Sequence, residues 1–376
     1  MTNNPFLISH PDDLRTKING LTGLWRRRWE HFLACAEAEQ RTIRWYGSHQ
    51  MCDVPTYAAF AWVVTQDPKW SAIARRDLVW LEKIYPDMRK GAYSDRDTWM
   101  WAAPMLRRAI SLDWIWDSDA LSDQERDRFA ELFITDALKY SYIVLRHRIP
   151  PHASNQGLAM ALNLVTVGYL FGVKHGSDIR ARRLMEFGLP HLLHQIAALP
   201  PDAYSGEGST YLCGVEAPLM TLACAVLEEV TGENMLRKQF KASGNSILRA
   251  LELTAYIIPP SGVLPGWDHY RFMLSTSATP SAYLASRTGD PKWYDFVMHG
   301  PGWERSGHFA WMRDGYLWQF LWMPDPTANT GRDGKPYYPE PWHEPHVGGS
   351  LLSRDDHLHL LQMWDAADQK PVRCPA

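Results

Sequence analysis

The stretch SDQERDRFAELFITDAL, residues 122–138, decides the fold class. Ser122, followed three positions later by Glu125, matches a capping box, in which each side chain bonds to a backbone N–H group of the helix start. Phe129 and Phe133 follow at helical spacing, so one face of the segment is apolar. The stretch therefore predicts an amphipathic helix that packs one face inward.

Similar helical patterns recur from about Asp12 to Trp303, separated by glycine and proline, with very little strand-like alternation. The clearest of them are Leu158 to Phe171, Pro218 to Val230 before Thr231-Gly232, and Ile247 to Ile258 before Pro259-Pro260. Several are apolar on most sides, as helices between neighbours are. They predict a mainly α protein with two concentric layers of helices rather than a four-helix bundle.

The pattern of residue types along the sequence changes after Gly302. Phe309 to Met312 and Tyr316 to Met323 are short and aromatic, which predicts strands, and Leu351 to Trp364 could supply more. We therefore expect a helical catalytic domain over residues 1–305 and a β-rich segment over 306–376, the start of a β-sandwich. A few strands cannot hide their edges, so we expect a partial β-layer with an exposed or partner-covered edge.

Composition limits the partners. The chain has 376 residues, 45% of them hydrophobic, enough for a large core. Its 42 acidic and 39 basic residues leave a net charge of −3, so neither nucleic acid nor an anionic membrane is an expected partner. No apolar run reaches the roughly 20 residues that span a bilayer, and Met1 to Gly20 lacks a signal-peptide core. We expect a soluble protein, cytoplasmic or periplasmic.

Cysteine and histidine spacing gives little support for a metal or a disulfide framework. The five cysteines are scattered and odd in number, and they indicate buried thiols. The residues whose spacing could place them around zinc or calcium are His343, His346, Asp355, Asp356, His357 and His359. Such spacings are common by chance, so no metal ligand or cofactor is assigned and a structural zinc or calcium is kept as an alternative.

Four short segments carry a likeness to known proteins. They are SLDWIWD at 111–117 with LS at 121–122 and ER at 125–126, HASNQG at 152–157, PDAYSGEGSTY at 201–211, and SGVLPGWDHYR at 261–271. Together they resemble the heparinase II/III-like polysaccharide lyases. The resemblance implies an (α/α) toroid, an incomplete barrel of antiparallel helix pairs, followed by an antiparallel β-sandwich.

The resemblance also implies an activity. Such lyases cleave uronate-containing acidic glycans by β-elimination, which leaves 4,5-unsaturated uronate ends. Asn155 stands where the family has its cleft-floor asparagine, and Tyr211 stands where its "DG…EG…Y" loop has the catalytic tyrosine. Two departures are Ala203, where the family has glycine, and the near absence of the sandwich that often supplies a catalytic histidine.

The chemistry of elimination sets what the residues must do. Removing the C5 proton adds charge beside an existing carboxylate, so donors must neutralise that carboxylate, and Asn155, His152 and Arg271 are the candidates. Tyr211 could take the C5 proton or protonate the leaving O4, although a phenol pKa of about 10 must fall before it acts as a base. His269 is the alternative base.

Each assignment has a structural alternative. Asn155 could be a helix N-cap, a role compatible with anion binding, and Tyr211 could be a packed aromatic. Glu207 fits a loop-ordering carboxylate better than a general acid, and His269 could be a partly buried hydrogen-bonded residue. We nevertheless expect Asn155, Tyr211 and His269 to point into one pocket.

Two further sets could bind an acidic sugar chain. Arginines could clamp it through planar bidentate contacts, although arginines on helices are usually solvated; these are Arg107, Arg108, Arg146 and Arg148. Tryptophans could stack on sugar rings, although core packing is the commoner role; these are Trp99, Trp101, Trp114 and Trp116.

Two rival functions stay open. The first is a glycoside hydrolase on a similar toroid, which would need two carboxylates flanking one bond, with Asp202, Glu207 and Asp268 as the supply. The second is a glycan-binding or scaffold protein without catalysis. The short β-rich segment favours that second alternative.

Overall fold

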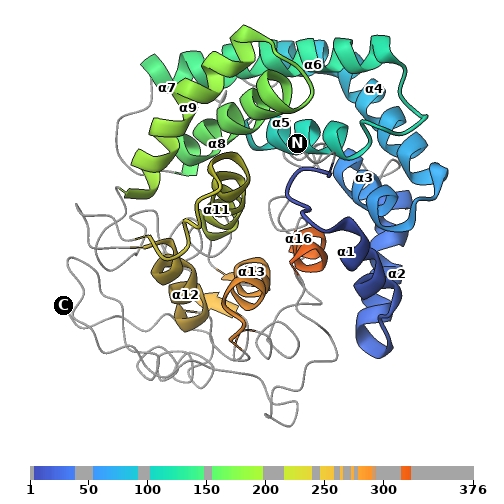
Figure 1. Ribbon diagram of the computed structural model, residues 1–376, viewed down its shortest axis with the longest axis vertical. Coiled ribbons are helices and arrows are strands. Elements are labelled where there is room, and N and C mark those ends of the chain that lie inside the picture. Colours follow the sequence, from blue (N-terminus) through green and yellow to red (C-terminus); the bar gives the residue numbers. More distant parts are fainter. Residues whose placement is uncertain are drawn as a thin grey trace. The chain divides into compact units, whose positions relative to one another are not determined.

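The computed structural model describes eleven stretches of the chain, which are mainly helical (Figure 1). They are residues 4–38, 54–91, 102–147, 155–197, 216–238, 246–257, 263–265, 272–274, 278–290, 293 and 315–322. The chain divides into two compact units, and each is taken by itself. The first comprises Met1–Ile196, Leu222–Met235 and Tyr316–Leu321, and the second comprises the remaining segments.

The first unit is built from helices. In chain order they are α1 (Pro11–Asn19), α2 (Gly23–Ala38), α3 (Val54–Thr65), α4 (Pro68–Gly91), α5 (Ala102–Trp114), α6 (Asp123–Ala137), the π-helix η3 (Leu138–Tyr142), α7 (Ile143–His147), α8 (Asn155–Tyr169), the π-helix η4 (Leu170–Lys174) and α9 (Ile179–Ala197), with most of α11 (Ala217–Thr231) and of α16 (Gly315–Leu321). Helix α3 packs on α2, α4 and α5, and α5 packs in turn on α6 and α8. The core lies between these helices.

Helix α6 forms as the sequence predicts. The Ser122 side chain accepts a hydrogen bond from the Glu125 N–H, and Glu125 Oε2 accepts one from the Ser122 N–H at 3.1 Å. Phe129 and Phe133 are buried at 0% and 2% exposure. Arg75 of α4 adds a contact that the sequence does not indicate, with its Nη2 at 2.6 Å from Glu125 Oε1. One carboxylate therefore caps α6 and ties it to α4.

We expect Glu125→Gln to lower the free energy of unfolding by about 1–2 kcal/mol at neutral pH, because it weakens the cap and removes the ion pair. The hydrogen bond from Arg75 lowers the pKa of Glu125 from 4.5 to about 2, against the opposing effect of burial. The difference in free energy of unfolding between the wild type and the variant is therefore largest above pH 4.5 and is lost as the pH falls toward 2. Urea unfolding over a pH series measures it.

Glu131→Gln is the matched control, since Glu131 lies on the same helix with its side chain 54% exposed. Its change should stay within roughly 0.5 kcal/mol, as for most exposed ion pairs. Equal losses for the two variants, or a Glu125→Gln loss that does not shrink in acid, would contradict the account.

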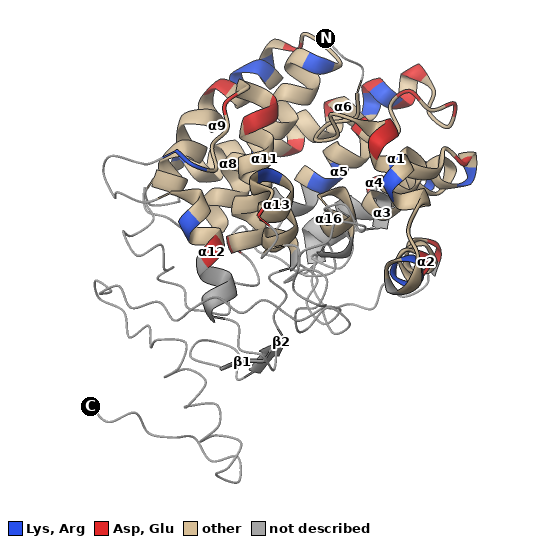
Figure 2. Ribbon diagram, turned by 60° about the horizontal axis from the view of Figure 1, so that its bottom comes forward, with Lys and Arg blue, Asp and Glu red and all other residues tan. Residues whose placement is uncertain are grey.

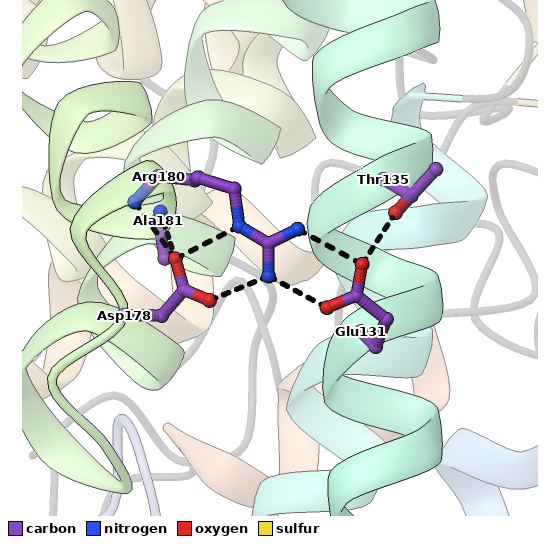
Figure 3. Close-up of polar contacts among 5 residues, drawn as sticks. All are labelled: Glu131, Thr135, Asp178, Arg180 and Ala181. Carbon is purple, nitrogen blue, oxygen red and sulfur yellow. Dashed lines mark hydrogen bonds and ion pairs between the residues drawn. The ribbon is translucent and has the colours of Figure 1, made fainter.

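Glu131 belongs to a polar network that joins α6 to the start of α9 (Figure 3). Arg180 donates to both Glu131 oxygens, at 2.9 and 2.6 Å, and also to Asp178. Asp178 Oδ1 accepts from the backbone N–H groups of Arg180 and Ala181, at 2.7 and 3.2 Å. The hydrogen bonds from Arg180 lower the pKa of both carboxyls. Asp178 therefore caps the first turn of α9, and the exposed pair between Arg180 and Glu131 adds a surface contact with α6.

Three glycines let α8 and α9 approach closely. A Cβ at Gly168 would lie 2.6 Å from the Ala181 carbonyl oxygen, and one at Gly188 would lie 2.7 Å from Leu164 Cβ. A Cβ at Gly157 would instead meet the end of the Gln195 side chain, at 2.8 Å. The backbones therefore pack where ordinary side chains would not fit.

One sequence expectation needs correction in this region. Within the described ranges, the continuous helix Asn155–Lys174 is long and apolar enough by composition to cross a membrane. The statement that no apolar run reaches that length is therefore wrong here. However, 83% of its most apolar window is buried inside the protein, as in a core helix.

Helix α16 overturns another expectation. Tyr316 to Met323 was predicted to be a strand, but Gly315–Leu321 is a helix. Phe320 is fully buried and its ring lies 5.2 Å from that of Trp29 and 5.7 Å from that of Phe32. Aromatic residues favour strands only where they fit a pleated surface, and here packing on α2 outweighs that preference. The other predicted strands of 306–376 lie outside the described residues.

The second unit contains α12 (Ile247–Ile257), β1 (Val263–Pro265), β2 (Phe272–Leu274) and α13 (Ala278–Thr288). Helices α12 and α13 pack together. The two strands pair antiparallel, with Leu264 opposite Met273. The sequence did not indicate this hairpin, because strands of three residues are too short to show an alternating pattern.

Candidate functional site

Asn155 is the predicted site residue that the structure describes in most detail. It is the first residue of α8 and is only 5% exposed. Its Oδ1 is buried and has no hydrogen-bond partner within the described part of the chain. A buried polar atom left unpaired costs roughly 1–3 kcal/mol, so its retention calls for an explanation. This oxygen can accept a hydrogen bond from a ligand, whereas an anion could be held only by the Nδ2 donor of the same amide.

The position of Asn155 at a helix start adds to this capacity. Backbone N–H groups of a first helical turn point away from the helix body and carry partial positive charge. Such a terminus favours a carboxylate or phosphate beside it. The start of α8 therefore combines an unpaired acceptor oxygen with backbone N–H groups that favour an anion.

Gln195 is a neighbour that sequence reasoning missed. It lies on α9, is 3% exposed, and its Cδ, Oε1 and Nε2 are all 2.8 Å from where a Cβ of Gly157 would be. The amide therefore lies flat over the first turn of α8. A glycine so near the start of an apolar helix was the available signal, since it marks a close approach by another group.

The predicted arginines behave differently from one another. Arg107 and Arg108 on α5 are 7% and 2% exposed, so the alternative of solvated surface arginines is wrong for both. Arg146 is exposed, its Nη1 donates to the Tyr142 hydroxyl at 2.6 Å, and its Cζ lies 5.7 Å from the centre of that ring. Arg146 is therefore engaged locally on α7 and η3.

Of the candidate sugar platforms, the structure describes Trp114 and Trp116. Trp114 is 3% exposed and donates from Nε1 to the Phe6 carbonyl at 2.8 Å, so it is a core residue. Trp116 is partly exposed, and one face is covered by His175, whose ring centre lies 4.1 Å away. Trp114 therefore presents no open ring of the kind that stacks on sugars, and one face of Trp116 is already occupied by His175.

Many predicted residues lie outside the described part of the chain, and their roles stay predictions. These are Trp99, Trp101, Arg148, His152, Asp202, Glu207, Tyr211, Asp268, His269, Arg271, and the His343, His346, Asp355, Asp356, His357 and His359 set. Among the residues that are described, no group of three or more His, Cys, Asp or Glu side chains could hold a metal ion.

Charged residues of both signs are interspersed along α6 and α9. Figure 2 shows Lys and Arg positions among Asp and Glu positions along α6 and α9, as the sequences DQERDRFAE and IRARRLMEF require. These helices do not form a uniformly basic surface of the kind that collects nucleic acid.

Comparison with known proteins does not identify the chain. No protein-family model matches it, and no curated protein matches it. A functional assignment therefore has to come from the residues and the geometry described above.

Proposed function

We propose that the chain is a polysaccharide lyase of the heparinase II/III-like type, which cleaves uronate-containing glycans by β-elimination. The observation that carries the proposal is Asn155, a buried carboxamide at the start of α8, whose Nδ2 would donate to the uronate carboxylate and whose unpaired Oδ1 would accept from a sugar hydroxyl. It stands in the HASNQG segment, where the resemblance expects an amide that holds the uronate carboxylate. The mainly helical fold agrees with the proposal. The arrangement of the helices as an (α/α) toroid, followed by a β-rich C-terminal segment, is itself part of the proposal.

In the proposed reaction the substrate loses a proton at C5 and gains a proton at O4. A base takes the C5 proton, the C5–H electron pair forms the C4–C5 double bond, and the C4–O4 bond breaks. Negative charge builds on the uronate carboxylate, where donors from Asn155, His152 and Arg271 would stabilise it. Tyr211 would protonate the departing O4, and either Tyr211 or His269 would act as the base.

The remaining proposed contacts orient the substrate. Glu207 would order its loop, Trp101 would stack on a sugar ring, and Arg146 would have to leave Tyr142 before it could bind an acidic sugar. Arg107 is buried in α5, which suits a role in charge balance near the substrate better than that of a mobile clamp. The implied partner is an acidic polysaccharide or oligosaccharide.

We expect Asn155→Ala to lower turnover by about 100-fold, in line with the loss of one preorganised oxyanion donor. Asn155→Ser is the informative partner variant, because Asn155 is the first helical residue rather than the N-cap, and serine there keeps a small polar side chain but lacks the amide. It should keep the wild-type melting temperature and still lose turnover. Full activity in Asn155→Ser would show that Asn155 serves only the helix.

A screen of acidic glycans tests the proposal itself. Each glycan is incubated with the protein and followed by ultraviolet absorbance, because a 4,5-unsaturated uronate carries a conjugated chromophore. A rise in absorbance with at least one uronate glycan is the expected result. New reducing ends without absorbance would favour the hydrolase instead, and binding without any cleavage would favour the glycan-binding alternative.

A further inference from the structure

The N-terminal strap, defined as residues 4–9, packs within the first unit through Phe6, Leu7 and Ile8, which are all buried. Phe6 is fully buried, its N–H donates to Asp113 Oδ2 at 2.6 Å, and its carbonyl accepts from Trp114 Nε1 at 2.8 Å. Its ring lies 5.6 Å from that of Tyr169. Leu7 has a φ of 67°, a conformation that residues other than glycine rarely adopt. Contacts with the helices therefore hold the strap in a shape that its own backbone disfavours.

Asp113 connects the strap to η4. Its side chain is 0% exposed, and its Oδ1 accepts from Lys174 Nζ at 2.5 Å and from His175 Nε2 at 2.6 Å. The His175 N–H bonds to the Leu170 carbonyl at 2.8 Å, which closes the wide π-helical turn and brings both donors to one carboxylate. Trp116 covers the His175 ring. One buried carboxylate thus joins three donors from two parts of the chain.

The charges facing this carboxylate are unequal. Glu229 of α11 also faces it, and burial raises the pKa of Glu229, with Lys174 opposing the shift and Asp113 adding to it. Tyr169 of α8 faces the same groups, and burial, Glu229 and Asp113 all raise its pKa. One lysine therefore faces two carboxylates. When both carboxylates are ionised, a proton on His175 supplies the second positive charge. A charged donor also binds a carboxylate more strongly than a neutral one.

We propose that Asp113, Lys174, His175 and Glu229 form a pH-controlled latch on the N-terminal strap, closed when His175 is protonated and loosened when it is neutral. Neutral His175 leaves Asp113 with a weaker donor and the cluster with an uncompensated negative charge. Repulsion from Glu229 then acts on an Asp113 side chain that has one weaker donor, so Asp113 is held less firmly in the position where it accepts from the Phe6 N–H. The disfavoured Leu7 conformation promotes release. The latch is independent of the proposed lyase activity.

The exchange of the Phe6 amide hydrogen, followed by NMR, tests the latch directly because that hydrogen is the one bonded to Asp113. After correction for the chemical exchange rate, its protection should fall by roughly tenfold between about pH 5.5 and about 8.5, since a charge-assisted bond replaced by a neutral one changes an opening equilibrium by about that factor. The Leu164 amide in α8 should keep its protection. An unchanged Phe6 protection, or an equal fall at Leu164, would overturn the proposal.

Variants assign the pH dependence to its source. His175→Gln keeps a neutral donor. The exchange protection of the Phe6 amide should then be low and should not change with pH. His10→Gln is the matched control, since His10 is exposed near the strap and makes no side-chain cap, and it should retain the wild-type profile. A flat profile in His10→Gln would overturn the proposal.

A second variant covers the case in which His175→Gln does not fold. Glu229→Gln removes the second carboxylate, so the midpoint of the Phe6 transition should move to lower pH. A midpoint that stays in place would show that Glu229 and His175 are not coupled, and the latch as proposed would be wrong.

Discussion

Gly168→Ala is expected to lower the free energy of unfolding by about 2–4 kcal/mol. The new Cβ would lie 2.6 Å from the Ala181 carbonyl oxygen and from Met185 N and Cβ. Two of these atoms belong to the α9 backbone, so relief requires the helices to separate. The better helix propensity of alanine offsets only about 1 kcal/mol of that cost. Chemical unfolding measures the difference.

Gly157→Ala is the matched control on the same helix face. Its Cβ would meet only the carboxamide of Gln195, which can rotate away, so the expected loss is about 1 kcal/mol or less. Equal losses at both positions would mean that the close approach of α8 and α9 near Gly168 is not what the structure describes.

Tyr211→Phe is expected to lower turnover strongly. The change deletes one hydroxyl and keeps the ring, so turnover should fall by at least about 100-fold if that hydroxyl moves a proton in the rate-limiting step. Substrate binding should change little. Steady-state kinetics on the best substrate, with binding measured separately, distinguish the two quantities.

Tyr204→Phe provides the control for that experiment, because Tyr204 lies in the same PDAYSGEGSTY segment. It should retain near wild-type turnover. If Tyr211→Phe retains it as well, Tyr211 is not the proton donor or acceptor, and His269 would have to carry both roles.

Local signals in the sequence predict much of the helical structure. The capping box at Ser122 and Glu125 marks the start of α6, and Gly232, with a φ of 71°, marks the end of α11. Such signals depend on neighbours within a few residues. They fail at α16, where buried contacts with α2 determine the conformation of an aromatic run.

The candidate site is less predictable for the same physical reason. The sequence marks Asn155 as a residue at a helix start, and the structure gives its burial and its unpaired oxygen. Gln195 and the Asp113 cluster depend on contacts between residues far apart in the chain, such as Phe6 with Asp113 and Asp113 with His175. No local pattern encodes such pairings. Tyr211 and His269 stay predictions, because they lie outside the described residues.

The origin of the oxygen in the product distinguishes elimination from hydrolysis. The best substrate of the ultraviolet screen is cleaved in water labelled with heavy oxygen, and the masses of the products are measured by mass spectrometry. Elimination breaks the C4–O4 bond without adding water, so the new ends should carry no label and should absorb in the ultraviolet. Incorporation of labelled oxygen at the new ends, without the chromophore, would show hydrolysis and contradict the account.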